Sequence, residues 1–297
     1  MDININTNEN MSVTRTPEEI RQEFNRVRHK AERPLYYLLV VINICIIAVL
    51  LFVPEVSESL VEETGEESYG GFLGWIIVVT VIVGLIFGFY KQYGEKLSYS
   101  VRVTPTNFPE IYETSVEYAR MLGLKKVPEI YICQENGTLN AFATWVFGKR
   151  YIQLNAEIVD IAYMENKDLD TVRFVLGHEF GHVYMKHVTL AYNLGFLFAK
   201  LIPVLGALMT RAQEYSADRV AQILTQQTGT KCMTMLTAGR HLYAYVDTDD
   251  YINNILKEKN LLEHVSYFFV NLFASHPIMP FRIKAIMDPE RKSGRLI

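Results

Sequence analysis

Two long stretches without charged side chains limit the folds that this chain can adopt. Residues 35–53 form a run of 19 residues without a charge, and residues 72–90 form a second run of the same length. A helix of this length crosses the roughly 30 Å hydrocarbon layer of a bilayer at about 1.5 Å per residue. A core helix as long as this normally carries a polar face, so we predict two transmembrane helices.

The distribution of basic residues predicts how these helices are oriented. Six Lys and Arg residues precede the first run, and Lys91, Lys96 and Arg102 follow the second. The loop between the runs contains six glutamates and neither Lys nor Arg. Basic residues stay on the cytoplasmic side, so the N-terminus and everything after Tyr90 should be cytoplasmic. We therefore expect a multi-pass protein of a bacterial cytoplasmic membrane, with the lipid bilayer as a partner.

A helix is expected before the first run. Thr16 can cap its N-terminus, Pro17 suits the first helical position, and the helix should continue to about Glu32 and end before Pro34. Residues 1–12 are polar and are expected to be disordered. The expected organisation is an N-terminal segment, a two-helix membrane anchor and a larger domain, at residues 1–33, 34–90 and 91–297.

The stretch FVLGHEFGHVYM, residues 174–185, places ionisable side chains in an apolar run that should form a buried helix. His178 and His182 lie four residues apart, so both imidazoles project from one helix face and can bind one metal ion. Catalytic zinc sites use three protein ligands and leave a fourth position to water. Glu179 would lie beside that water and accept its proton, as in the H-E-x-x-H motif.

The alternative interpretation of this stretch is a pair of hydrogen-bonded core histidines. The chain contains only seven histidines, so a chance H-E-x-x-H is rare and we favour a zinc site. The small residues Gly177 and Gly181 would let a neighbouring strand or a substrate come close to the helix.

A third metal ligand is predicted downstream, in the stretch RAQEYSADRVAQIL. Glu214 and Asp218 lie four residues apart on a predicted helix. Glu214 would be the third ligand, and Asp218 would accept a hydrogen bond from a ligating histidine. An isolated E-x-x-x-D is more often part of a solvated helix, but its position shortly after H-E-x-x-H favours the metal site.

These motifs resemble a known family. HEFGH, then E-x-x-x-D, then SHPIMPFR near the C-terminus are similar to the HtpX-like membrane zinc metallopeptidases, which are related to the CAAX prenyl endopeptidases. The resemblance extends from Pro105 to the C-terminus and includes the paired N-terminal runs. It implies a gluzincin fold, one zinc ion, and endoproteolysis of membrane or misfolded proteins. By this resemblance the zinc ligands are His178, His182 and Glu214, and Glu179 is the general base.

Two further roles follow from the resemblance alone. His276, in SHP, resembles the residue that stabilises the oxyanion. Arg282, six residues later, resembles the arginine that steadies the glutamate ligand.

Three short β-rich runs precede the catalytic helix and predict a small antiparallel meander. They cover residues 127–134, 138–147 and 150–155, with turns at Asn136-Gly137 and Gly148-Lys149.

One of these runs has an expected functional role. Residues 140–143 resemble the family's edge strand along the active-site cleft, and an edge strand offers free N–H and C=O groups to an extended peptide. Asn140 is the expected substrate residue of this strand. Phe142 and Trp145 are expected to pack in the core.

A third apolar run, residues 188–210, should not cross the membrane. His182 and Glu214 must reach the same zinc, so they lie on the same side of the bilayer. Two crossings need about 40 residues and a turn, but only 31 residues lie between these ligands. Related HtpX-like enzymes place two membrane helices here, and this sequence departs from that pattern. We expect a helical hairpin on the membrane surface or over the active site.

The remaining features narrow the class of protein. Residues 261–274 are expected to form an amphipathic helix that packs under the site. The cysteines Cys45, Cys133 and Cys232 are dispersed and predict neither a disulfide framework nor a metal pair. The net charge of -4 gives no indication of nucleic-acid binding.

We therefore predict an α+β, mainly helical protein with two N-terminal transmembrane helices and a zincin-type domain with a small antiparallel sheet. Its expected function is that of a membrane-anchored zinc endopeptidase that acts on extended polypeptides, with protein quality control as the expected role. The alternatives are a CAAX prenyl-protein protease and a non-catalytic pseudo-protease adaptor. Loss of Glu179 with retention of the ligands would have indicated the adaptor.

Overall fold

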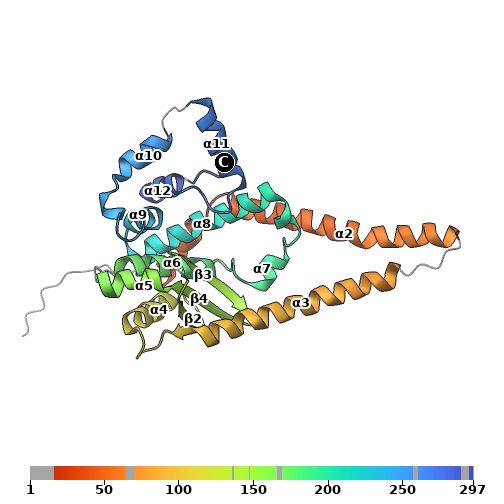
Figure 1. Ribbon diagram of the computed structural model, residues 1–297, viewed down its shortest axis with the longest axis horizontal. Helices are drawn as coiled ribbons and strands as arrows, with labels where there is room; N and C mark the ends of the chain where they lie inside the picture. The colour runs from red at the N-terminus through yellow and green to blue at the C-terminus, as the bar shows by residue number, and fades with distance from the viewer. Residues whose placement is uncertain are drawn as a thin grey trace, which may run out of the picture.

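The computed structural model describes residues 17–64, 70–135, 137–146, 148–165, 169–256, 260–288 and 294–296. The protein is mainly helical. Two long helices, α2 (Glu32–Thr64) and α3 (Gly70–Tyr99), extend in the same direction from a body that contains the sheet and the other helices (Figure 1).

Helix α2 contains a candidate membrane span. Among the described residues, the window Glu32–Val49 is the one that is long and apolar enough to cross a bilayer. Large apolar side chains in this window, such as Tyr37, Val41 and Ile44, are exposed, as expected for a surface that lipid covers. Helix α3 contains the second charge-free run, and its crossing of a bilayer stays a prediction.

The helix before the membrane run is shorter than predicted. Helix α1 (Pro17–Arg26) ends at Arg26, and α2 begins at Glu32 and includes Pro34. Pro34 is tolerated because the first-turn N–H groups of a helix have no partner within that helix. Thr16 and residues 1–12 lie outside the described residues. Phe24 and Val27 join the main core, so the N-terminal segment packs into the body.

The sheet is mixed, and the predicted antiparallel meander is wrong. Its strands are β1 (Ser100–Arg102), β2 (Glu129–Cys133), β3 (Ala141–Val146) and β4 (Lys149–Asn155), in the order β1-β2-β4-β3. β2 and β4 are parallel, whereas the other two pairs are antiparallel.

The burial of β4 explains this order. Tyr151, Ile152 and Leu154 are fully buried, and a strand that is apolar on successive positions belongs in the middle of a sheet. The turn at Gly137 therefore joins strands that are not neighbours, and no hairpin forms there; Asn136 lies outside the described residues. β3 and β4 do form a hairpin, in which Gly148 has a φ of 82°.

The centre of the body is a pair of helices, α6 (Leu169–Tyr184) and α8 (Pro203–Thr225). A Cβ atom on Gly181 would lie 2.9 Å from the Ala217 Cα atom, so the glycine permits a very close approach of the two helices. The sequence predicted a close neighbour at this glycine, and the neighbour is a helix rather than a strand or substrate.

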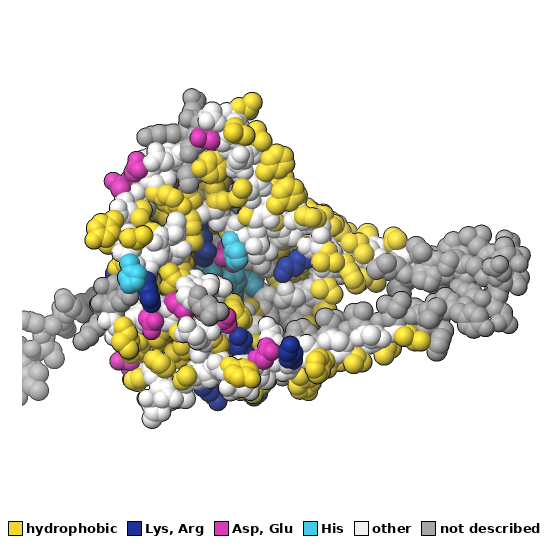
Figure 2. All heavy atoms as spheres, viewed as in Figure 1, with side chains coloured by type: hydrophobic (Ala, Val, Ile, Leu, Met, Phe, Trp, Pro, Cys, Tyr) yellow, Lys and Arg dark blue, Asp and Glu magenta, His cyan; other side chains and the backbone are white. Residues whose placement is uncertain are grey.

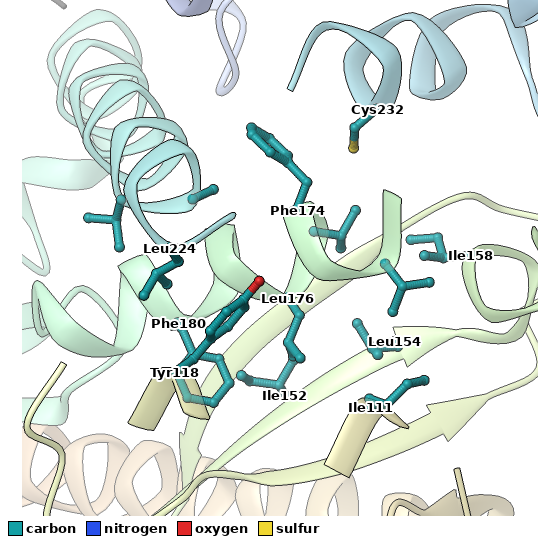
Figure 3. Close-up of a cluster of buried hydrophobic side chains, with 14 of the residues drawn as sticks. Ile111, Tyr118, Ile152, Leu154, Ile158, Phe174, Leu176, Phe180, Leu224 and Cys232 are labelled. Atoms are coloured by element: carbon teal, nitrogen blue, oxygen red, sulfur yellow. The ribbon is translucent and has the colours of Figure 1, made fainter. Parts of the chain in front are cut away.

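The main core lies between α6, the sheet and α4 (Pro109–Met121). Figure 3 shows Leu176 and Phe180 of α6 on the side of Ile152 of β4, whereas Phe174 points away from the sheet, towards Cys232. The short helix α5 (Ala156–Asp160) and a π-helical turn, Ile161–Glu165, connect β4 to α6.

Residues 188–210 form no continuous helix and no helical hairpin, so the predicted hairpin is wrong. The segment contains α7 (Leu190–Leu194), a 3₁₀ turn (Ala199–Leu201) and the start of α8 at Pro203. It is held on α2 by the side chain of Asn43, which donates to Leu194 O (3.3 Å) and accepts from Phe198 N–H (2.8 Å). Pro203 lacks a backbone N–H and suits the first turn of a helix, and α8 begins at this residue.

The C-terminal part contains α9 (Thr230–Ala238), a 3₁₀ turn (Tyr243–Tyr245), α10 (Thr248–Leu256), α11 (Leu261–Phe273) and α12 (Met279–Met287). Helix α11 does not pack under the site as predicted. Asn271 is its one buried residue. Arg211 of α8 holds the end of α11 by a 2.6 Å hydrogen bond to Ala274 O.

Candidate metal centre and active site

Two helices bring together three side chains of the kinds that ligate metal ions. Helix α6 supplies His178 and His182, one turn apart, and α8 supplies Glu214. The Nε2 atoms of the two histidines are 3.1 Å apart, and the Glu214 carboxylate oxygens lie 3.5 Å from His178 Nε2 and 3.4 Å from His182 Nε2. One donor atom from each residue lies within 4.8 Å of the others. The three side chains therefore converge on one point.

The donor set fits zinc. Two imidazole nitrogens and one carboxylate oxygen are the protein ligands of many catalytic zinc sites. The Nδ1 atoms of both histidines are engaged in hydrogen bonds with other side chains. Each Nε2 atom is consequently left to bind a metal ion.

Asp218 lies behind His178, in the position that the sequence predicted. Its Oδ1 atom is 2.8 Å from His178 Nδ1. Burial alone would raise the pKa of Asp218, but the charge and hydrogen bonds of Arg282 hold that pKa below its ordinary value. The carboxylate is therefore ionised and accepts a hydrogen bond from the imidazole.

Arg282, on α12, contacts both acidic residues of α8. Its Nη2 atom lies 3.3 Å from Glu214 Oε2 and 2.7 Å from Asp218 Oδ1. Burial opposes ionisation of Glu214, yet Arg282 and the nearby histidines hold the pKa of Glu214 well below its ordinary value. Glu214 is thus kept as an anion, which is the form that binds a metal ion.

Glu179 is buried beside this cluster. Burial raises the pKa of its carboxyl group, against the opposing effect of His178 and His182. The carboxylate accepts a hydrogen bond from the backbone N–H of Ala143 on β3. A carboxylate with a raised pKa is better suited to accept a proton from water at neutral pH.

His276 lies at the rim of the cluster, between α11 and α12. Its side chain is 64% exposed, and its Nδ1 atom is 3.2 Å from Glu214 Oε2. The hydrogen bond to Glu214 raises the pKa of the imidazole. The residue therefore faces solvent on one side and the carboxylate on the other.

A cavity of about 450 Å³ opens beside the cluster. Its lining includes Glu179, His276, and Asn140 and Phe142 of the β3 segment. Figure 2 shows histidine side chains inside a hollow on this face. β3 is at the edge of the sheet, as predicted.

Phe142 and Trp145 of this strand differ from the expectation, whereas the role of Asn140, just before the strand, is open. Asn140 is exposed, but its Oδ1 atom accepts a 2.9 Å hydrogen bond from Ala141 N–H. Its role as a substrate residue stays a prediction. Phe142 and Trp145 are partly exposed, and Phe142 lines the cavity rather than packing in the core. The position of β3 at the sheet edge explains their exposure, since an edge strand is covered on fewer sides.

The structure adds two residues near the cluster, His187 and Glu32, that the sequence analysis did not identify as functional. His187 Nδ1 lies 2.9 Å from His182 Nδ1, and His187 Nε2 lies 3.1 Å from Glu32 Oε1. Burial holds the pKa of His187 well below its ordinary value, so this imidazole is neutral. The spacing of His187 from His182 could have attracted notice, but no local pattern marks Glu32, which is 155 positions away from His187.

Comparison with known proteins identifies the family. The model of peptidase family M48 matches residues 105–198 and 190–290. These ranges cover well over half of the 297 residues. No curated protein and no solved structure matches the chain. The match agrees with the resemblance to HtpX-like and CAAX-type peptidases. The chain therefore belongs to peptidase family M48, a family of zinc metallopeptidases.

Proposed function

We propose that this protein is a membrane-anchored zinc endopeptidase that cleaves extended segments of membrane or misfolded proteins. One observation carries the proposal. The buried carboxylate of Glu179 adjoins the cluster of His178, His182 and Glu214, and all four residues line one cavity beside an edge strand.

In this proposal His178, His182 and Glu214 hold the zinc ion. When bound, zinc lowers the pKa of water and polarises a carbonyl oxygen. Glu179 accepts the proton of the attacking water at its carboxylate and returns it to the leaving amine. His276 donates a hydrogen bond to the oxyanion from the rim of the cavity.

The edge strand β3 supports extended polypeptides as the class of substrate. The N–H of Ala143 points to Glu179 rather than to β4, so this edge of the sheet faces the metal cluster. An extended peptide laid along β3 would bond to main-chain groups, and such contacts are tolerant of substrate sequence. The strand would thereby place a scissile carbonyl next to Glu179.

The two long helices support a location of the protein at a membrane. Helices α2 and α3 would cross the membrane, with residues 1–33 and 91–297 on the cytoplasmic side. Apolar side chains on α11, including Phe268 and Phe273, are exposed, as are Leu194 and Leu201 beside α2. Apolar side chains line the face between α11 and α2 (Figure 2). Contact of this face with the bilayer would remove these side chains from water.

Digestion of casein by the purified full-length protein tests the proposal. Glu179→Gln keeps the size of the side chain but cannot take a proton, so it should keep zinc and lose about 10²- to 10⁴-fold in rate. Glu157→Gln is the matched control, because Glu157 is also buried but lies outside the cavity.

Three results would contradict the proposal. Wild-type digestion by Glu179→Gln excludes the assigned base. A zinc-loaded wild-type protein that cleaves nothing is an adaptor rather than a peptidase. Cleavage restricted to prenylated peptides, with casein intact, indicates a CAAX-type protease.

A further inference from the structure

A chain of buried side chains connects the metal cluster to the anchor helix. It runs from His182 on α6 to His187 in the turn after α6 and then to Glu32, the first residue of α2. The atom pairs are His182 Nδ1 to His187 Nδ1 (2.9 Å) and His187 Nε2 to Glu32 Oε1 (3.1 Å). Glu32 is fully buried, and His187 is 6% exposed.

Glu32 is held as a carboxylate at the end of this chain. Arg28 forms an ion pair with its Oε1 atom. The hydroxyl group of Ser216 on α8 donates a 2.5 Å hydrogen bond to its Oε2 atom. A buried carboxylate without such partners would be costly, and here both oxygens have a donor.

An ionised carboxylate determines which nitrogens carry the protons. Glu32 can only accept, so His187 must present Nε2–H to it. With its proton on Nε2, the His187 ring presents the lone pair of Nδ1 to His182, which then donates from its own Nδ1–H. His182 is left with a lone pair on Nε2, the atom that faces His178 and Glu214. The opposite tautomers would place two lone pairs together at Glu32 and a proton on the metal-facing nitrogen.

We propose that Glu32 and His187 are positioning residues that fix the tautomer and ring orientation of His182 for metal binding. The proposal rests on the proposed function, in which His182 is a zinc ligand. Asp218 has the same role for the other proposed histidine ligand, because it bonds directly to His178 Nδ1. One histidine is thus supported from within α8, and the other from the membrane anchor.

The consequence is that the anchor forms part of the metal centre. Glu32 belongs to α2, the helix with the membrane-spanning window. The boundary expected between residues 33 and 34 separates Glu32 from the domain that it supports. A shift of α2 relative to α6 would break the contact between Glu32 and His187, and so would alter zinc affinity.

Zinc affinity of the full-length protein in detergent, measured by competition with a chelator, tests the proposal. Glu32→Ala and His187→Phe should each weaken zinc binding by about 10- to 100-fold. The double variant should bind zinc no more weakly than His187→Phe, because Glu32 acts through His187. His187→Gln should retain most of the affinity, since an amide can accept from His182 and donate to Glu32.

Asn43→Ala is the matched control. Asn43 also lies on α2, is 4% exposed, and bonds to the catalytic domain through Leu194 and Phe198. Its loss removes one contact between α2 and the segment before α8 and leaves the chain from Glu32 to His182 in place. Zinc affinity should therefore be unchanged in this variant.

Several results would overturn the proposal. Wild-type zinc affinity in Glu32→Ala, additive losses in the double variant, or an equal loss in Asn43→Ala would each do so. If Glu32→Ala does not fold, the comparison of His187→Phe with His187→Gln decides, and equal affinities refute the proposal. A wild-type protein that binds no zinc would instead refute the proposed function.

Discussion

Arg282 and Asp218 form a two-point ion pair, in which Arg282 Nε lies 2.6 Å from Asp218 Oδ2 and Arg282 Nη2 lies 2.7 Å from Asp218 Oδ1. The same guanidinium reaches Glu214. The two carboxylates lie one turn apart on α8 and are both buried. A single cation from α12 therefore compensates two negative charges of α8, one in the cluster and one behind it.

Replacement of Arg282 should destabilise the fold strongly. Arg282→Met would leave Asp218 and Glu214 buried without a cation, and loss of one partner of a buried pair costs about 3–5 kcal/mol in unfolding free energy. Chemical denaturation of the metal-free protein measures this loss. Arg282→Lys keeps the charge but not the two-point geometry, so it should lose less. A loss no larger for Arg282→Met than for Arg282→Lys would contradict this account.

Replacement of Asp218 and replacement of Glu214 should weaken zinc affinity to different extents. Asp218→Asn removes the anionic acceptor behind His178 and should weaken zinc affinity by about 10- to 100-fold. Glu214→Gln removes a proposed ligand and should weaken it further. Zinc titration against a chelator distinguishes the two variants. Loss of the metal in Asp218→Asn with retention in Glu214→Gln would reverse the assignment.

His276 should act on turnover rather than on metal binding. The oxyanion exists only in the transition state, so a donor aimed at it affects kcat. His276→Phe should lower kcat by about 10²- to 10³-fold. Its side chain is exposed, so the variant should fold and its zinc content should remain that of the wild type. A variant that loses zinc would identify His276 as a ligand instead.

Gly181 should be required for the geometry of the cluster. A methyl group there would meet backbone atoms of α8 at 2.9 and 3.1 Å. Gly181→Ala must therefore move α6 away from α8 and separate the histidines from Glu214, at a cost of about 1–3 kcal/mol. Thermal unfolding and zinc titration should both show the defect. Gly94→Ala in α3, where no atom lies within 4 Å, is the control and should show neither.

Acid should loosen the N-terminal segment through His29. Burial lowers the pKa of this imidazole below its ordinary value. Its Nε2 atom bonds to Gly294 O, and its Nδ1 atom accepts from Ala31 N–H, so the neutral ring fits. The unfolded chain takes up a proton at a higher pH than the folded one does, so stability falls as the pH drops through the ordinary pKa of about 6.5.

His29→Gln cannot titrate and should lose part of this dependence. Melting temperatures of the two proteins at about pH 7.5 and about pH 5.5 provide the comparison. An identical fall in the melting temperature of both proteins would exclude His29 as a contributor.

The sequence alone determined the features that depend on local geometry. In H-E-x-x-H and E-x-x-x-D, the spacing of four residues places side chains on one face of a helix wherever that helix lies. His178 therefore faces the same way as His182, and Glu214 the same way as Asp218, as predicted. The apolar character of residues 35–53 similarly follows from composition.

The tertiary structure decided the features that depend on which segments meet. The order of β2, β3 and β4 follows from the burial of β4 in the folded body, and no turn motif at Gly137 could indicate it. Helix α11 has an apolar sequence that suits a packed helix, but the body leaves it exposed. Its expected place under the site was therefore wrong.

The contact between Glu32 and His187 shows most clearly what the sequence alone could not predict. The sequence predicts Glu32 as the last residue of an N-terminal helix. In the structure it is the first residue of α2, because the chain turns between residues 27 and 31. Its carboxylate contacts His187, the neighbour of His182, only once α2, α6 and α8 have packed together. Helical spacing predicts neighbours within one turn, whereas contacts between distant segments arise from the packing of the whole chain.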